Sequence, residues 1–252
     1  MSRYLIFAYG ILCYTMFLGV FVYSIAFLGN LFIPNSIDAA PRVPVIQAIL
    51  IDVGLLGLFA VQHSVMARPA FKRWWTKIVP EPAERATYVL FSNVAMVALF
   101  VFWEPIGGTI WSLEPGLAAN LVYGLYFLGW AVLFYATLLL NHFELCGVRQ
   151  VWLHLRGKPY TDIPFNEPGM YRYVRHPIYV GWLMIFWFTP VMTAAHLLFA
   201  VMTTVYILVA IQFEEKDLVD HFGDDYRSYK RRVGMLIPRI NTSEPENSST
   251  TI

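Results

Sequence analysis

The chain has 252 residues, of which 58% are hydrophobic and only 14% are charged, and its net charge at neutral pH is +1. Because a soluble domain typically carries about 25% charged residues, this composition excludes an ordinary soluble protein and indicates a multi-pass protein of the lipid bilayer. The small net charge gives no sign of nucleic-acid binding, and the two cysteines, Cys13 and Cys146, predict neither a disulfide framework nor a zinc site.

Long apolar runs begin almost at the first residue. The first run is too long for the apolar region of a signal peptide, so we expect an uncleaved membrane span there. Four runs are long enough to cross roughly 30 Å of hydrocarbon: Leu5–Ile33, Val45–Met66, Ala86–Trp103 and Leu117–Leu140.

Two further apolar runs, Ile178–Thr189 and His196–Phe213, are separated by a short break and predict a tight helical hairpin. Since Ile178–Thr189 is borderline in length, five spans with one re-entrant piece stay open beside six spans. In either case the predicted fold is an all-α, polytopic membrane helix bundle, which forms a single domain over residues 1–240.

Basic residues occur in three segments, which follow the second, fourth and last apolar runs. With six spans, these segments all lie on one side of the membrane, and the positive-inside rule places both termini in the cytoplasm. The segments 34–44 and 104–116 would lie on the other side, and Arg42 is their only basic residue. The basic residues are Arg68, Lys72, Arg73, Lys77 and Arg85, then Arg149, Arg156, Lys158, Arg172 and Arg175, then Lys216, Arg227, Lys230, Arg231 and Arg232.

Three polar segments complete the chain. The segment Asn141–Arg175 is rich in aromatic residues, glycine and proline, so we expect an ordered loop. The segment Glu214–Arg232 predicts one amphipathic cytoplasmic helix, because apolar residues recur in it at three- or four-residue spacing. Residues 241–252 are polar throughout most of their length and predict a disordered tail.

The stretch YRYVRHPIYVGW at residues 171–182 leads from the polar loop into the predicted hairpin. Pro177 suits the first turn of a helix, where no N–H donor is needed. The positive end of that helix dipole and the side chain of Arg175 favour an anionic ligand group, such as a carboxylate or phosphate. A simpler interpretation is also open, in which Arg175 is a positive-inside anchor and the tyrosines form an interfacial belt.

Two adjacent carboxylates, Glu214 and Glu215, end the last apolar run. Such groups are costly at the end of a membrane helix unless they face water or a cation. The predicted hairpin returns them to the same membrane face as His176. We therefore expect a pocket at the cytoplasmic interface that holds a ligand with both cationic and anionic groups.

The segments RHPIYVGW, EEKDL and HFGDDYRSYKRRVGMLIPRI together resemble the isoprenylcysteine carboxyl methyltransferase superfamily of membrane enzymes. The resemblance covers residues 168–238, which it marks as the cofactor-binding core, and it implies S-adenosylmethionine as the methyl donor. It also implies that the donor site is formed by His176, Pro177, Tyr179 and Glu214, with Tyr171, Arg175 and Glu215 beside them.

The segments FAVQHSVMARPAFKRWW, VPEPAERATYVL, FWEPIGGTIW and NHFELCGVRQVWL resemble the bacterial methanethiol S-methyltransferases within that superfamily. The resemblance implies a small thiol acceptor and a bacterial inner membrane. Ala210 stands where the isoprenylcysteine enzymes are expected to carry an arginine, which argues against a prenylcysteine carboxylate. Two alternatives stay open: a prenylated or lipid-like acceptor, and a non-enzymatic accessory or transport protein similar to the NnrU group.

A thiol attacks as its thiolate, so a base or a nearby cation would assist methyl transfer. The candidates are His63, His142, with Glu144 as its weaker neighbour, and Arg149. A structural role for His63 is also open, and Arg149 and Gln150 either contact the donor or order their loop. We expect a structural role for Asp52, exposure for His154 and His221, and no role for His196. No group of residues has metal-ligand spacing, so we expect no metal.

Overall fold

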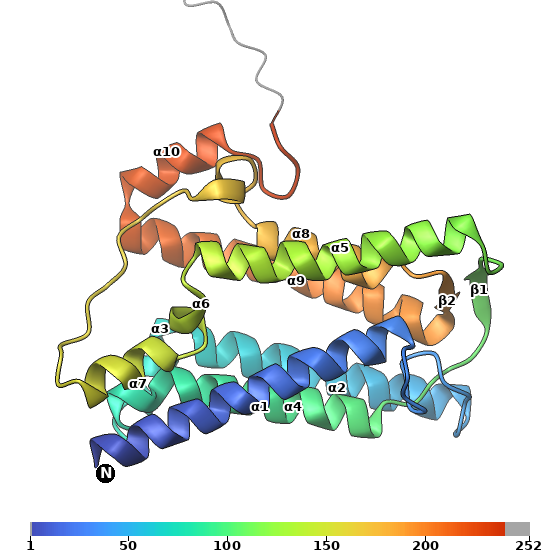
Figure 1. Cartoon of the computed structure of the whole chain (residues 1–252), viewed down its shortest axis with the longest axis horizontal. Coiled ribbons are helices and arrows are strands. Elements are labelled where there is room, and N and C mark those ends of the chain that lie inside the picture. The colour runs from blue at the N-terminus through green and yellow to red at the C-terminus, as the bar shows by residue number, and fades with distance from the viewer. Residues whose placement is uncertain (1, 240–252) are drawn as a thin grey trace, which may run out of the picture.

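Five long helices run along the longest axis of the molecule in the computed structural model, which describes residues 2–239 (Figure 1). Each is long and apolar enough to cross a membrane, so the expected all-α membrane bundle is confirmed. They are α1 (Arg3–Gly29), α2 (Val45–Ala67), α4 (Glu84–Phe102), α5 (Leu117–Leu139) and α9 (Ala194–Phe222). The predicted tail at 241–252 lies outside the described residues.

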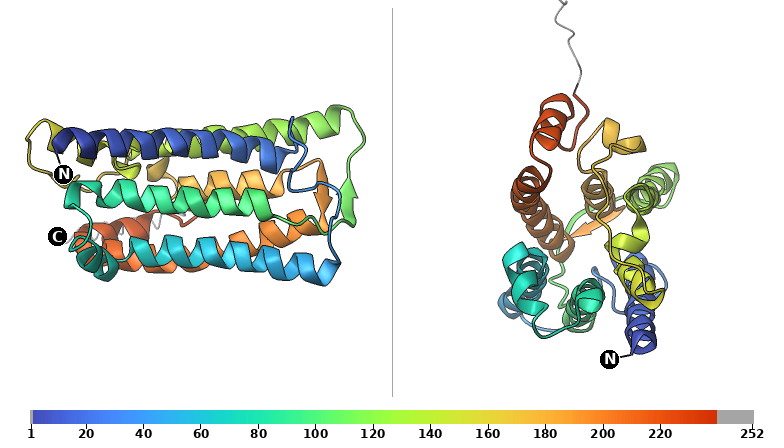
Figure 2. Two further views of the ribbon diagram at one scale, coloured as in Figure 1. Left: turned by 90° about the horizontal axis from the view of Figure 1, so that it is seen from below. Right: turned by 90° about the vertical axis from the view of Figure 1, so that its left-hand side faces the viewer.

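The other predicted span is much shorter than a bilayer is thick. Helix α8 (Pro177–Trp187) has 11 residues and rises only about 16 Å. From α8 the chain continues into β2 (Val191–Thr193), which pairs antiparallel with β1 (Thr109–Ser112). The start of α1 and helix α10 (Asp224–Arg232) lie at one end of the bundle, and the strands lie at the other (Figures 1 and 2). The chain therefore reaches the strand end of the bundle through the short helix α8 followed by the extended segment that includes β2.

Short helices occupy the end of the bundle where α1 begins (Figure 1). The segment Asn141–Arg175 is ordered as expected, and it contains three of these helices. The short elements are α3 (Pro69–Trp75), η1 (Glu81–Ala83), α6 (His142–Leu145), α7 (Val148–Leu155), η2 (Gly169–Arg172) and α10.

The prediction of one helix over Glu214–Arg232 was wrong. Helix α9 continues without interruption to Phe222, and the chain turns at Gly223 before α10 begins. Gly223 has a φ of +58°, a backbone conformation that glycine adopts without a steric penalty. Two aspartates then lie in the first turn of α10, where they interact favourably with the helix dipole.

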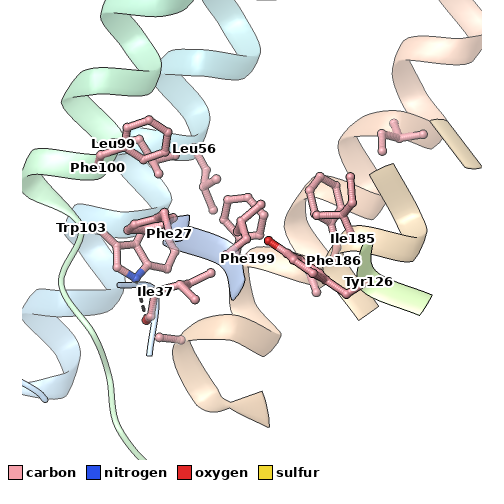
Figure 3. Packing of buried hydrophobic residues seen from close by; sticks show 14 of the residues in the cluster. Phe27, Ile37, Leu56, Leu99, Phe100, Trp103, Tyr126, Ile185, Phe186 and Phe199 are labelled. Atoms are coloured by element: carbon pink, nitrogen blue, oxygen red, sulfur yellow. Dashed lines mark hydrogen bonds between the residues drawn. The ribbon is translucent and has the colours of Figure 1, made fainter. Parts of the chain in front are cut away.

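Buried apolar side chains from most of the long helices meet between them (Figure 3). Trp103, which follows α4, donates a hydrogen bond from Nε1 to the carbonyl of Ile37 at 3.1 Å. Helices α5 and α8 approach most closely at Gly129 and Gly181. A Cβ atom on Gly181 would lie only 2.8 Å from the carbonyl oxygen of Gly129, so the glycine of the RHPIYVG stretch permits this contact.

Histidine 196 joins elements at the strand end of the bundle. It is fully buried, and its Nδ1 lies 3.0 Å from Oδ2 of Asp38, while its Nε2 lies 3.2 Å from the carbonyl oxygen of Phe186. Asn30 and Thr193 also donate hydrogen bonds to Asp38. His196 thus lies at the opposite end of the bundle from the motif residues. No role was expected for it from the sequence, whereas these contacts give it a structural one. Asp52 is structural too, because its Oδ1 accepts a hydrogen bond from the backbone of Glu104 at 2.9 Å.

The Asp38 contacts predict a loss of stability in acid. Burial raises the pKa of Asp38, but the hydrogen bonds from His196, Thr193 and Asn30 outweigh it and hold the pKa below its usual value of 3.8. The ionised form therefore stabilises the fold above that value, and this contribution is lost as the pH falls through the lower pKa of the folded state. We expect Asp38→Asn to lower the stability at neutral pH by about 1.5–3 kcal/mol and to flatten its decline in acid.

Thermal unfolding in detergent, recorded from neutral pH down to about pH 3, measures this effect. Glu114→Gln is the control, since Glu114 is exposed at the same end of the bundle. An Asp38→Asn variant with the wild-type melting temperature at every pH would contradict the assignment.

Candidate functional site

The start of α8 is held by the segment that follows α10. The backbone N–H groups of Arg175 and His176 donate to the carbonyls of Gly234 and Met235, at 2.8 and 3.2 Å. Pro177 takes the first position of α8, as its missing N–H group favours. The chain turns tightly after this contact, because a Cβ on Gly234 would lie 1.9 Å from the carbonyl oxygen of Ile237. The segment before α8 and the segment after α10, which are distant in the sequence, are therefore held together by backbone hydrogen bonds.

Glu215 is the centre of a buried ionic cluster. It is only 2% exposed, and its carboxylate accepts hydrogen bonds from Arg175 Nε at 2.6 Å and His176 Nε2 at 3.1 Å. Lys230 Nζ lies 2.7 Å from the other carboxylate oxygen. Arg175 also donates to the carbonyls of Lys230 and Val233. This cluster neutralises Arg175 inside the protein, so that the structure does not support its expected attraction of an anionic ligand.

The neighbouring Glu214 faces a different environment. Its side chain is 43% exposed, and Oε2 accepts a hydrogen bond from the Tyr179 hydroxyl at 2.9 Å. His176 Nδ1 lies 3.9 Å from the same oxygen, so the imidazole stands between the two glutamates. Among residues 2–239, no lysine or arginine lies within 4 Å of the Glu214 carboxylate. Glu214 therefore keeps the capacity to bind a cationic ligand group.

Tyr171 supports this cluster from the side of η2. Its hydroxyl donates to the carbonyl of Ala136 at 3.4 Å, and its own carbonyl accepts from the Tyr229 hydroxyl at 2.6 Å. Burial raises the pKa of Tyr171 well above its ordinary value, so the phenol stays protonated. The residue joins α5, η2 and α10, which is a structural role.

An apolar cavity of about 250 Å³ lies among α1, α2, α4, α8 and α9. The ring of Tyr179 lines it, and the hydroxyl of the same residue contacts Glu214. The cavity and the exposed carboxylate are therefore adjacent. The other polar lining groups are Ser24, His63, Ser92, Asn93, Thr203 and Tyr206.

His63 is the histidine that faces this cavity. Its Nε2 lies 2.7 Å from the Tyr88 hydroxyl, its Nδ1 lies 3.2 Å from Ser92 Oγ, and its ring stacks on Phe59. His63 was predicted from the sequence, whereas Tyr88 and Ser92 were not. These two residues lie one helical turn apart on α4, so polar side chains at four-residue spacing within an apolar run were the available signal.

His142 lies outside the cavity lining. It is buried, its Nδ1 lies 2.9 Å from Thr137 Oγ1, and its Nε2 lies 3.1 Å from the Tyr14 hydroxyl. Burial lowers the pKa of His142, which favours the neutral ring. The residue connects α1, α5 and α6 and does not approach Glu214.

Arg149 and Gln150 belong to a separate network around Glu144. Arg149 Nη1 and Gln150 Nε2 donate to its carboxylate at 2.8 and 2.7 Å, and the Tyr160 hydroxyl donates at 2.6 Å. Gln150 lines a polar cleft of about 610 Å³ that shares no residue with the Glu215 cluster. Of the two roles considered for Arg149 and Gln150, the geometry favours ordering of the loop.

Comparisons with known proteins place these residues in a family. The phospholipid methyltransferase family model matches residues 157–225, which include all of the Arg175, His176, Tyr179, Glu214 and Glu215 group. The chain is 52% identical over 240 residues to the methanethiol S-methyltransferase of Crocosphaera subtropica, a match that covers 95% of this chain and 94% of that protein. The chain belongs to the methanethiol S-methyltransferase family.

Two other relatives have the same name. The methanethiol S-methyltransferase of Mycobacterium tuberculosis is 50% identical over 238 residues, covering 94% of this chain and 98% of that protein. Methanethiol S-methyltransferase 1 of Bradyrhizobium diazoefficiens is 49% identical over 237 residues, covering 94% and 83%. No solved structure matches the chain. The resemblance found in the sequence is thus confirmed, and the protein is a multi-pass membrane methyltransferase.

The range matched by the phospholipid methyltransferase model, residues 157–225, divides the candidate site into two parts. The glutamates, His176 and Tyr179 lie within the segment matched by the phospholipid methyltransferase model. His63, Tyr88 and Ser92 lie outside it, on α2 and α4. Tyr179 belongs to the matched segment and to the cavity wall, so it connects the two parts.

Proposed function

We propose that the protein transfers a methyl group from S-adenosylmethionine to methanethiol, giving dimethyl sulfide and S-adenosylhomocysteine. The observation that carries this proposal is the hydrogen bond between Glu214 and Tyr179 at the edge of an apolar cavity that also contains His63. The printed names of the relatives support methanethiol as the acceptor.

The residues around Glu214 suit the donor. S-adenosylmethionine supplies a methyl group that is already activated on a cationic sulfonium. The carboxylate of Glu214 attracts such a cation, and the ring of Tyr179 offers it a cation–π surface. Glu215 and Arg175 hold His176 and the start of α8 in place, so these two residues position the site rather than contact the donor.

The cavity suits the acceptor. Its apolar walls concentrate a hydrophobic thiol and exclude water, and positioning of two reactants is a large part of the rate gain in such transfers. His63 takes the thiol proton as general base, because the thiolate is the nucleophilic form. Tyr88 and Ser92 orient the imidazole through their hydrogen bonds to it.

The distribution of charge assigns an orientation in the membrane. The basic residues that follow the second, fourth and last apolar runs lie at the end of the bundle that carries the short helices. The positive-inside rule therefore favours a cytoplasmic location for this end, which includes the start of α1 and helix α10, and the cytoplasm is also where S-adenosylmethionine is made available. We assign the protein to the bacterial inner membrane on the same argument and on the bacterial relatives.

Headspace gas chromatography tests the function and the donor site together. Purified protein supplied with S-adenosylmethionine and methanethiol is expected to release dimethyl sulfide. Glu214→Gln keeps the size of the side chain but removes its charge, so we expect about 10- to 100-fold weaker binding of S-adenosylmethionine, as a charged hydrogen-bonding partner is lost. Binding of S-adenosylhomocysteine, which lacks the sulfonium charge, should weaken less.

The control is Asp220→Asn, an exposed carboxylate on the same helix. Equal binding of both compounds by wild type and Glu214→Gln would contradict the donor site. Wild-type protein that binds the donor but yields no dimethyl sulfide would contradict methanethiol as the acceptor.

A further inference from the structure

The cavity next to Tyr179 is elongated, and most of its polar groups lie towards one end. Ser24 lies towards the other end, where its hydroxyl donates a hydrogen bond to the carbonyl of Val20 at 2.8 Å. The polar lining groups His63, Ser92 and Tyr206 each have an apolar lining residue about two helical turns away on the same helix. These partners are Leu56 on α2, Leu99 on α4 and Phe199 on α9. Two turns of α-helix rise roughly 10 Å, so the cavity extends about that far from His63 towards the strand end of the bundle.

The apolar end is a well-defined compartment. Leu56, Leu99, Phe186 and Phe199 converge there from four helices (Figure 3). Behind Phe199, the ring of Trp103 packs edge-on at a centroid distance of 5.8 Å. A space of about 250 Å³ with an apolar lining drawn from five helices is large enough to hold a small apolar ligand.

This space is much larger than methanethiol requires. A dry cavity of about 150 Å³ is enough to bind benzene. With its sulfur at His63, methanethiol would fill only the end of the cavity near His63 and would leave the space beside Leu56, Leu99 and Phe199 empty. A linear apolar thiol of several carbons would cover all three of these side chains.

The geometry points to a wider acceptor class: apolar alkanethiols of several carbons are methylated by this protein, with the sulfur at His63 and the chain directed towards Leu56, Leu99 and Phe199. This inference rests on the proposed function and extends it. A bond forms between the acceptor sulfur and the methyl carbon. The bond from that carbon to the donor sulfonium breaks, its electron pair stays on the donor sulfur, and His63 receives the thiol proton.

Each methylene group added to the acceptor is transferred from water to the apolar wall of the cavity, which strengthens binding. The expected gain in kcat/KM is about fourfold per methylene, from methanethiol through ethanethiol and propanethiol to butanethiol. The thiol 2-mercaptoethanol is similar in size to propanethiol but carries a second polar group, which Leu56, Leu99 and Phe199 cannot hydrogen-bond. It should therefore be a poorer acceptor than propanethiol.

The test measures thioether formation from this series, by gas chromatography, with purified protein and S-adenosylmethionine. A variant, Leu56→Phe, narrows the apolar end, so its ratio of kcat/KM for butanethiol to that for methanethiol should fall to about one. Leu58→Phe makes the same change on the lipid-facing side of α2, where Leu58 is 55% exposed, and should keep the wild-type ratio. Partition of thiols into detergent is the same in all three proteins, so the ratios isolate the cavity.

A wild-type kcat/KM that is lower for butanethiol than for methanethiol would overturn the inference while leaving the proposed function intact. An unchanged ratio in Leu56→Phe, together with an unchanged ratio in Leu58→Phe, would also overturn it. Turnover with none of the thiols, methanethiol included, would overturn both the inference and the proposed function.

Discussion

Replacement of His63 by glutamine is expected to lower kcat/KM for methanethiol at neutral pH by at least about 10²-fold, the usual contribution of a general base. Glutamine keeps a polar group within reach of Tyr88 and Ser92, but it cannot accept a proton. His63 lines the apolar cavity and lies 2.7 Å from the Tyr88 hydroxyl, so its imidazole is held at the proposed acceptor site. Donor binding at Glu214 should stay unchanged, because Glu214 lies on another helix, α9, and does not line the cavity.

The pH dependence distinguishes a base from a residue that only shapes the cavity. Without a base, the variant depends on thiolate formed in solution, so its rate should rise about tenfold per pH unit until the thiol is ionised. The wild-type rate should rise less steeply over the same range. His221→Gln, which changes an exposed histidine, is the control. Parallel pH profiles for wild type and His63→Gln would contradict the assignment of His63 as the base.

The convergence of the motif residues was predictable because it depends on short-range features. Pro177 sets the start of a helix, and a hairpin must return Glu214 and Glu215 to the membrane face from which it began. The structure brings His176 within 3.1 Å of Glu215 and 3.9 Å of Glu214, as this argument requires. A local pattern was therefore enough to predict that these residues lie close together.

The separate roles of the two glutamates were not predictable from the same pattern. Adjacent residues on a helix point about 100° apart, but the sequence does not say which of them faces the protein interior. That depends on α10 and the segment after it, which bring Lys230 and the Val233 carbonyl next to Arg175 and Glu215. Arg175 consequently serves as an internal ion-pair partner, whereas its position beside a helix N-terminus had indicated an anion site.

The proposed acceptor side of the site was harder to predict for a different reason. His63 stood out as an ionisable residue in an apolar run, but Tyr88 and Ser92 are ordinary residues of membrane helices. They contact His63 only because α2 packs against α4, and the sequence of one apolar run does not predict which helix packs against it. The length of α8 shows the same limitation: its apolar run continues to Thr189, but the chain leaves the helix after Trp187 to pair β2 with β1.

Replacement of Glu215 by glutamine is expected to destabilise the protein by about 3–5 kcal/mol, because removal of one partner leaves a buried charge uncompensated. Glu215 is 2% exposed and interacts with Arg175, His176 and Lys230. Arg175 in turn connects the start of α8 to the end of α10. We therefore expect a large fall in melting temperature and faster proteolysis around residues 174–176 and 233–236.

The neighbouring Glu214→Gln variant is the matched comparison, because it makes the same chemical change one residue earlier. Glu214→Gln should weaken donor binding and leave the melting temperature unchanged. Glu215→Gln should instead have its main effect on the melting temperature, which should fall. The double variant Arg175→Met with Glu215→Leu should recover much of the lost stability, since an apolar pair replaces a buried ion pair at little cost. If Glu215→Gln melted like wild type and failed to bind the donor, Glu215 would be a ligand contact, and the division of roles between the two glutamates would be reversed.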